Sequence, residues 1–184
     1  MLVFLDFEAS SLRKNGYPIE IAWVFEDGAC ESHLIRPAPG WDDWDEEAAT
    51  IHRITRATLL AEGEPHDAVA RRMVEVLDGH DLRASAPSWD GKWLSVLLRA
   101  AGLPRHALRL KDSDDSHCAA AAAVLRGHVP DEALDRAVRD VVALVQHRRA
   151  GTPAHRALAD AEEERQIWLA VRAEAEARVA GASG

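Results

Sequence analysis

The sequence contains little cysteine and has no long uninterrupted apolar run. Its 184 residues include two cysteines, Cys30 and Cys118, far apart and without Cys-x-x-Cys spacing. This excludes a disulfide-rich scaffold and argues against a structural zinc site. No segment approaches the roughly 20 apolar residues that span a bilayer. Met1 leads directly into an apolar segment, without the basic start and cleavage site of a signal peptide. We therefore expect a cytoplasmic protein.

An excess of basic residues is also missing. The chain has 22 Lys and Arg against 31 Asp and Glu, a formal net charge of −9. This argues against a protein that binds long nucleic acids through a broad basic surface. It does not argue against an enzyme that binds the end of a strand through metal ions and a few contacts. The length predicts one domain over residues 1–178, followed by a disordered tail over 179–184.

The pattern of apolar residues predicts the fold class. Strands are expected at 2–7, 19–25 and 31–35, and Asp27-Gly28 is a strong hairpin signal. Pro65 and Pro130 suit the first turns of helices, and Thr152 suits an N-cap. The expected helices cover 65–77, 91–101, about 119–123, 130–151 and the residues from 152, with strands at 82–86 and 107–110. This order predicts an α/β fold, a mixed β-sheet flanked by α-helices.

Two acids one residue apart interrupt the first apolar segment. Because strand side chains alternate between faces, Asp6 and Glu8 point the same way while Phe7 points opposite. Two like charges on a buried strand repel each other, and a divalent cation with a preference for carboxylate oxygens removes that cost. Such a pair is also common where a strand simply leaves the core. Other residues must therefore show whether Asp6 and Glu8 bind a metal.

Further acids follow at two later positions. Asp90 comes after a predicted strand at the start of a helix, where an acid is favoured by about 0.3–1 kcal/mol without any metal. Asp160 is flanked by the small residues Ala157 and Ala161, so its helix face is expected to pack closely on the sheet. His155 precedes Asp160 by five residues, which does not match the zinc-binding H-E-x-x-H pattern. It either reaches over the site from the start of the last helix or is solvated.

Taken in order, these motifs resemble the DEDDh 3′→5′ exonucleases of the ribonuclease H-like superfamily. The matching stretches are residues 5–10, 89–90 and 155–161. The resemblance implies four metal ligands, Asp6, Glu8, Asp90 and Asp160. They would hold two divalent ions, Mg²⁺ or Mn²⁺, that promote phosphodiester hydrolysis. His155 would be the general base, since histidine accepts protons near neutral pH.

The resemblance also implies the substrate and some of its contacts. Single-stranded RNA or DNA would be cut from its 3′ end to nucleoside 5′-monophosphates. Phe7, Ala9, Leu12 and His52 align near the terminal nucleotide, and Trp89 could stack on a base for about 1–3 kcal/mol. The family includes dimers, so a homodimer is one assembly that the resemblance allows.

Several alternatives stay open from the sequence. The protein could use the same metal site as a phosphodiesterase that acts on another substrate. It could also be a non-catalytic module that binds nucleic acid or assists a polymerase. Basic stretches at 13–14, 105–111 and 148–149 are either contacts with the strand or ordinary solvated faces.

Overall fold

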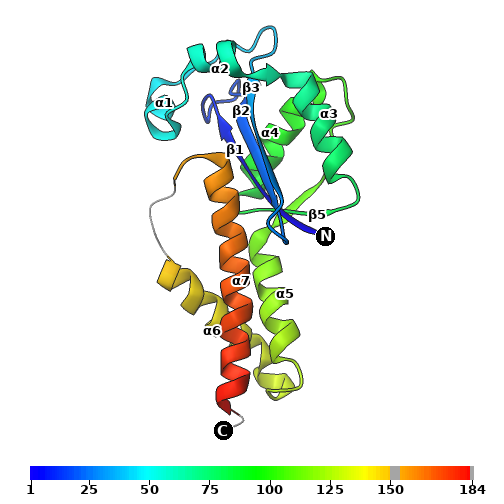
Figure 1. The fold of residues 1–184 in the computed structure, drawn as a ribbon, viewed down its shortest axis with the longest axis vertical. Coiled ribbons are helices and arrows are strands. Elements are labelled where there is room, and N and C mark those ends of the chain that lie inside the picture. The colour runs from blue at the N-terminus through cyan, green and yellow to red at the C-terminus, as the bar shows by residue number, and fades with distance from the viewer. Residues whose placement is uncertain (150–153, 183–184) are drawn as a thin grey trace.

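The computed structural model describes residues 1–149 and 154–182, which form a six-stranded sheet with helices on both faces (Figure 1). The order of the strands across the sheet is β4-β3-β2-β1-β5-β6. Their bounds are β1 Leu2–Ala9, β2 Pro18–Phe25, β3 Cys30–Arg36, β4 Glu64–Pro65, β5 Asp81–Ala84 and β6 Leu110–Asp112.

The pairing of the strands makes the sheet mixed. β1, β2 and β3 form an antiparallel meander, and β5 and β6 add to the other edge of β1 in parallel. The Asp27-Gly28 hairpin joins β2 to β3, with Gly28 at a φ of 96°, which glycine adopts without strain. The predicted α/β class with a mixed sheet is confirmed.

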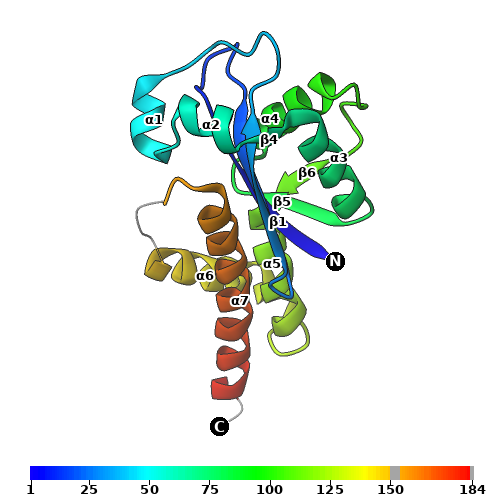
Figure 2. The same cartoon turned by 45° about the horizontal axis from the view of Figure 1, so that its top comes forward.

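The described residues form seven helices. They are α1 Glu46–His52, α2 Arg56–Glu62, α3 His66–Leu77, α4 Pro87–Ala100, α5 Ser113–Leu125, α6 Asp131–Arg149 and α7 Ala157–Ala182. Helices α3 and α4 lie on one face, and α5 and α7 lie on the other (Figure 2). Among the described residues, no helix combines the length and the apolar character needed to cross a bilayer.

The alternation of β1 determines which of its side chains enter which layer. Leu5 and Phe7 belong to the apolar core shared with α3 and α4. Phe4 points to the opposite face, where its ring contacts His117 of α5 and Trp168 of α7. Because strand residues repeat every second position, Asp6 lies on the same face as Phe4, toward α7.

A second core lies away from the sheet, between α5, α6 and α7. It is built from small and β-branched residues such as Ala121, Val141, Val145 and Val171. These three helices extend beyond the sheet and give the molecule its elongated shape (Figure 1).

Several expected boundaries differ from the observed ones. The short helices α1 and α2 were not expected; their N-caps are Asp45 and Thr55, whose side chains accept backbone N–H groups of the first turn. α4 begins at Pro87 rather than at 91, and the last strand lies at 110–112 rather than at 107–110. The expected N-cap Thr152 lies outside the described residues. α7 continues to Ala182, through most of the segment expected to be a disordered tail.

Candidate active site

Three carboxylates from the two ends of the chain converge on one point. Asp6 and Glu8 come from β1, and Asp160 comes from the first turn of α7. One oxygen of each carboxylate lies within 4.8 Å of the others. A set of hard oxygen ligands at this spacing can hold a divalent cation such as Mg²⁺ or Mn²⁺.

Asp90 completes the acidic group from the neighbouring helix. It lies in the first turn of α4 and is 3% exposed, although a capping acid would normally be solvated. Its Oδ2 is buried and has no hydrogen-bond partner among the described residues. Its side chain lies close enough to β1 for the backbone of Phe7 to affect its ionisation. Asp90 is close enough for its charge to raise the pKa of Asp6, but it is not one of the three acids whose oxygens lie within 4.8 Å of one another.

Burial and repulsion between neighbouring acids raise the pKa values of Asp6 and Glu8, and burial raises the pKa of Asp90. Burial, followed by the charges of Asp90, Glu8 and Asp160, raises the pKa of Asp6 to about 9. Burial also raises the pKa of Glu8 to about 7, with a further contribution from Asp160. Burial raises the pKa of Asp90 to about 7. A bound cation would favour the ionised forms of Asp6, Glu8 and Asp90, whose pKa values are all raised in its absence.

A fifth acid, Glu20, fixes the helix that carries Asp160. Glu20 lies on β2 directly opposite Glu8 and is 2% exposed. Arg156 donates to both of its oxygens, at 2.7 and 3.1 Å, and the backbone N–H of Ala157 donates to Oε2 at 3.0 Å. These three bonds attach the start of α7 to the sheet. Glu20 was not predicted as a site residue, because its only signal in the sequence is a single acid in an otherwise apolar strand.

His155 does not lie on the helix that the sequence predicted. It precedes α7 with a φ of 52°, a left-handed conformation that costs a residue with a side chain about 1–2 kcal/mol. The bonds on either side hold this backbone: the N–H of Ala154 donates to Oδ1 of Asp160 at 3.0 Å, and Arg156 binds Glu20. Strain retained in this way is typical of functional positions.

Of the residues expected near a terminal nucleotide, some are buried and others are exposed. The Phe7 side chain is buried in the core on the opposite face from the acids, so Phe7 can offer the site only its backbone. Ala9 ends β1. His52 is also buried, and its Nδ1 accepts the N–H of Ile54 at 3.1 Å. Leu12, by contrast, is 68% exposed in the loop after β1.

Trp89 is the other exposed residue of this set. It is 42% exposed, beside Asp90 in the first turn of α4. Its ring stacks on Trp93 with centroids 6.0 Å apart, and the Lys92 ammonium lies 5.2 Å from its centroid. Lys92 Nζ also donates to the carbonyl of Arg13 at 2.7 Å. These contacts connect the loop after β1 to α4.

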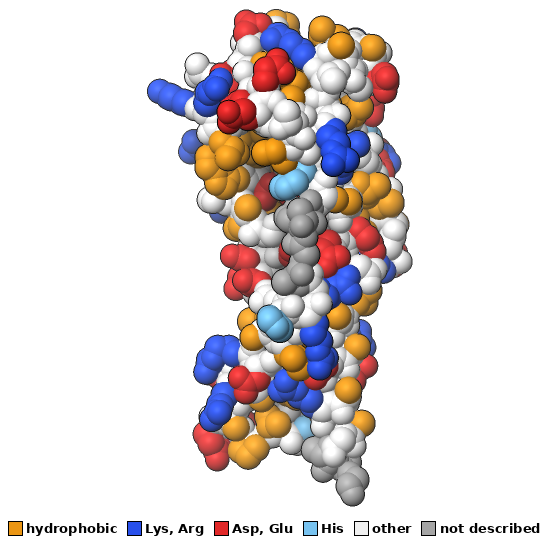
Figure 3. Space-filling view, turned by 90° about the vertical axis from the view of Figure 1, so that its left-hand side faces the viewer, with side chains coloured by type: hydrophobic (Ala, Val, Ile, Leu, Met, Phe, Trp, Pro, Cys, Tyr) orange, Lys and Arg blue, Asp and Glu red, His pale blue; other side chains and the backbone are white. Residues whose placement is uncertain are grey.

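Arginines from two of the three basic stretches noted in the sequence form ion pairs with acidic residues of the chain. Figure 3 shows the side of the molecule that carries α1 and the start of α7, where acidic and basic side chains are interspersed without a continuous basic area. Arg13 pairs with Asp45, and Arg148 and Arg149 pair with acids of α7. These arginines are therefore engaged in ion pairs within the chain.

Comparison with known proteins identifies the fold. No family model matches the sequence, and no curated protein does. Solved structures do match. E. coli exonuclease I in complex with single-stranded DNA, in a zinc-bound form, superposes with a TM-score of 0.66 at 17% identity over 98% of this chain and 42% of that chain. Exonuclease I from Methylocaldum szegediense gives 0.65 at 18% identity over 97% of this chain and 41% of that chain.

The fold is thus the ribonuclease H-like fold of exonuclease I, and the resemblance inferred from the sequence is confirmed at the level of the fold. An apo exonuclease I structure matches equally well, with a TM-score of 0.66. The chain spans 41–43% of the length of these three proteins.

The first prediction concerns Glu20. Glu20→Gln removes the negative charge from the Arg156 contact, so we expect unfolding free energy to fall by about 1.5–3 kcal/mol in denaturant melts. Because Glu20 holds the helix of Asp160, Mn²⁺ affinity measured by titration calorimetry should fall by about 10-fold. Asp67→Asn, which breaks an exposed pair with Arg71 on α3, is the control and should cost under about 0.5 kcal/mol. Equal stability of Glu20→Gln and wild type would refute the anchoring role.

The second prediction concerns pH in the absence of metal. Because the folded protein keeps protons on Asp6, Glu8 and Asp90 that the unfolded chain releases near pH 4, its stability should fall as pH rises from about 4 to about 9. Asp6→Asn removes the most shifted group and should raise stability at pH 8 by about 1–3 kcal/mol. Melts in EDTA across this range test this, with Asp135→Asn on the exposed face of α6 as control. A wild-type curve that rises through the window would contradict it.

Proposed function

We propose that the protein is a metal-dependent 3′→5′ exonuclease that hydrolyses single-stranded RNA or DNA to nucleoside 5′-monophosphates. The observation that carries the proposal is the convergence of Asp6, Glu8 and Asp160 on one point, beside the buried Asp90. The fold supports it, since the solved structures that share the fold include exonuclease I complexes with single-stranded DNA and with an oligonucleotide.

The residues fit two divalent cations with oxygen ligands, Mg²⁺ or Mn²⁺. Asp6, Glu8 and Asp160 would hold one ion, and Asp6 and Asp90 would contribute to the other. The raised pKa of Asp6 and the unpartnered Oδ2 of Asp90 are both features that positive charge relieves. When bound, two such ions activate the attacking water and stabilise the leaving 3′ oxygen.

His155 would act as the general base and take a proton from the attacking water onto a ring nitrogen. Its neighbours Ala154 and Arg156 bind Asp160 and Glu20, so the His155 backbone lies next to the acidic site. Imidazole exchanges protons near neutral pH, which suits hydrolysis under ordinary conditions.

Two exposed apolar side chains would receive the end of the strand. Leu12 follows β1, which carries Asp6 and Glu8, and Trp89 neighbours Asp90 on α4. The Trp89 ring can stack on any base and Leu12 can make apolar contact with one, so neither reads sequence. This arrangement supports a substrate that is single-stranded rather than paired.

The third prediction tests the activity itself. Matched 5′-labelled single-stranded RNA and DNA, from dinucleotides to about thirty residues, should give ladders that shorten from the 3′ end with Mg²⁺ or Mn²⁺ and none with EDTA. Asp160→Asn should abolish the ladder, because the site loses a ligand charge. The control is Asp135→Asn, on the outside of α6, which should retain full activity.

Two outcomes would contradict this proposal. No cleavage of either nucleic acid with either metal would favour a binding module or a phosphodiesterase for another substrate. A full ladder from Asp160→Asn would remove the metal assignment while leaving a nuclease.

The fourth prediction isolates His155. His155→Ala should lower kcat at neutral pH by about 100- to 10,000-fold, the usual contribution of general base catalysis, with Mn²⁺ affinity nearly unchanged. Steady-state kinetics and titration calorimetry measure the two effects separately. His147→Ala, at an exposed position on α6, is the matched control. An unchanged rate in His155→Ala would assign the base to another group.

A further inference from the structure

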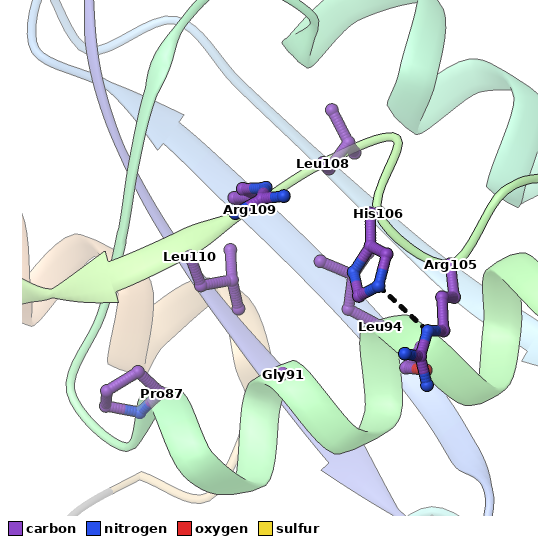
Figure 4. A pocket seen from close by; sticks show the side chains of 9 residues that line it. Pro87, Gly91, Leu94, Arg105, His106, Leu108, Arg109 and Leu110 are labelled. Atoms are coloured by element: carbon purple, nitrogen blue, oxygen red, sulfur yellow. Dashed lines mark hydrogen bonds between the residues drawn. The ribbon is translucent and has the colours of Figure 1, made fainter.

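A pocket of about 410 Å³ lies between α4 and the segment that leads into β6 (Figure 4). Leu94, Leu108 and Leu110 supply its apolar surface, while Arg105 and Arg109 supply positive charge. None of the nine residues that line it is acidic. The pocket therefore combines apolar surface with cations, which suits a ligand that carries both a phosphate and a base or sugar.

The two arginines of this pocket differ from most of the arginines considered above. Neither Arg105 nor Arg109 forms an ion pair with an acid in the part of the chain that the structure describes, whereas Arg13, Arg148 and Arg149 all do. The chain has nine more acidic than basic residues. Two guanidinium groups without an acidic partner therefore line one pocket of an acidic chain, and they are available to an anion.

Local contacts prepare Arg105 for an anionic ligand. Its Nε donates to Nε2 of His106 at 2.9 Å (Figure 4). This bond restrains the guanidinium and leaves its two terminal nitrogens without a partner among the described residues. Paired N–H groups of this kind match the oxygens of a phosphate group.

The position of the pocket relates it to the acidic site. Pro87 and Gly91 line the pocket from α4, and Asp90 lies between them in sequence but points toward β1. The two sites thus lie on adjoining sides of the same first turns of α4, because residues one position apart on a helix point about 100° apart. A strand whose 3′ end lies at the acids reaches the pocket within a few nucleotides.

We propose that the Arg105–Arg109 pocket binds a backbone phosphate of the single-stranded substrate, upstream of the 3′-terminal nucleotide. This inference rests on the proposed exonuclease function for the direction of the strand. It explains how an acidic protein holds a polyanion: the metal site receives the terminal phosphodiester, and a separate pair of arginines receives the strand. A dinucleotide is too short to use the pocket.

The test compares Arg105→Gln/Arg109→Gln with Arg126→Gln/Arg139→Gln. The control pair is exposed, lies at the end of α5 and on α6, and changes the net charge equally. Binding of a labelled 20-residue strand is measured by fluorescence anisotropy in EDTA at several salt concentrations. We expect the pocket variant to bind at least about 10-fold more weakly, with a salt slope smaller by about 0.7, the amount that one lost phosphate contact removes on a single strand. The control should bind like wild type.

Hydrolysis in Mn²⁺ provides the second measurement. The pocket variant should lose kcat/KM on the 20-residue strand while keeping the wild-type value on a dinucleotide. Equal affinity of the pocket and control variants for the long strand would overturn the proposal. An equal loss of kcat/KM on the dinucleotide would also overturn it, because the arginines would then act on the acidic site.

The two proposals fail in distinguishable ways. If wild type hydrolyses nothing but the pocket variant still loses affinity and salt slope in EDTA, the pocket is a nucleic-acid site and the exonuclease proposal is wrong. If wild type hydrolyses strands from the 3′ end and the two double variants behave alike, the exonuclease stands and the pocket proposal is wrong.

Discussion

The contact of Glu20 with Arg156 and Ala157 is the interaction on which the acidic site depends. It joins β2 to the start of α7 across 136 residues of sequence and places Asp160 against Asp6 and Glu8. A buried carboxylate is costly unless its oxygens are bonded, and here both of them are. Because the same contact lies next to His155, one ion pair positions both a ligand and the candidate base.

The acids themselves work against the stability of the fold. Burial and repulsion raise the pKa of Asp6 to about 9, so the ionised cluster is unfavourable without a cation. The left-handed backbone of His155 adds a further cost. Unfavourable features of this kind persist where surrounding contacts keep them in place. Here those contacts are the attachment of α7 to β2 and the burial of β1 between two layers of helices.

Local patterns made part of this structure predictable. The alternation of β1 correctly placed Asp6 and Glu8 on one face, and the order of strands and helices correctly predicted the fold class. Features that depend on tertiary contacts were missed. The helices α1 and α2 are seven residues each, too short for an apolar period to be visible, and Glu20 acquires its partner from the far end of the chain. The backbone of His155 was wrongly placed in a helix because its conformation is imposed by contacts on either side.

The separation of the ligands along the chain has a consequence for folding. Asp6 lies on β1 and Asp160 lies on α7, 154 residues later in the sequence. Contacts between such distant residues form late, because closing a long loop costs entropy before any contact repays it. Asp6 and Glu8 are brought together by β1 alone, whereas Asp160 reaches them only through the packing of α7 on β1 and β2. The candidate metal site is therefore complete only when α7 has packed on the sheet.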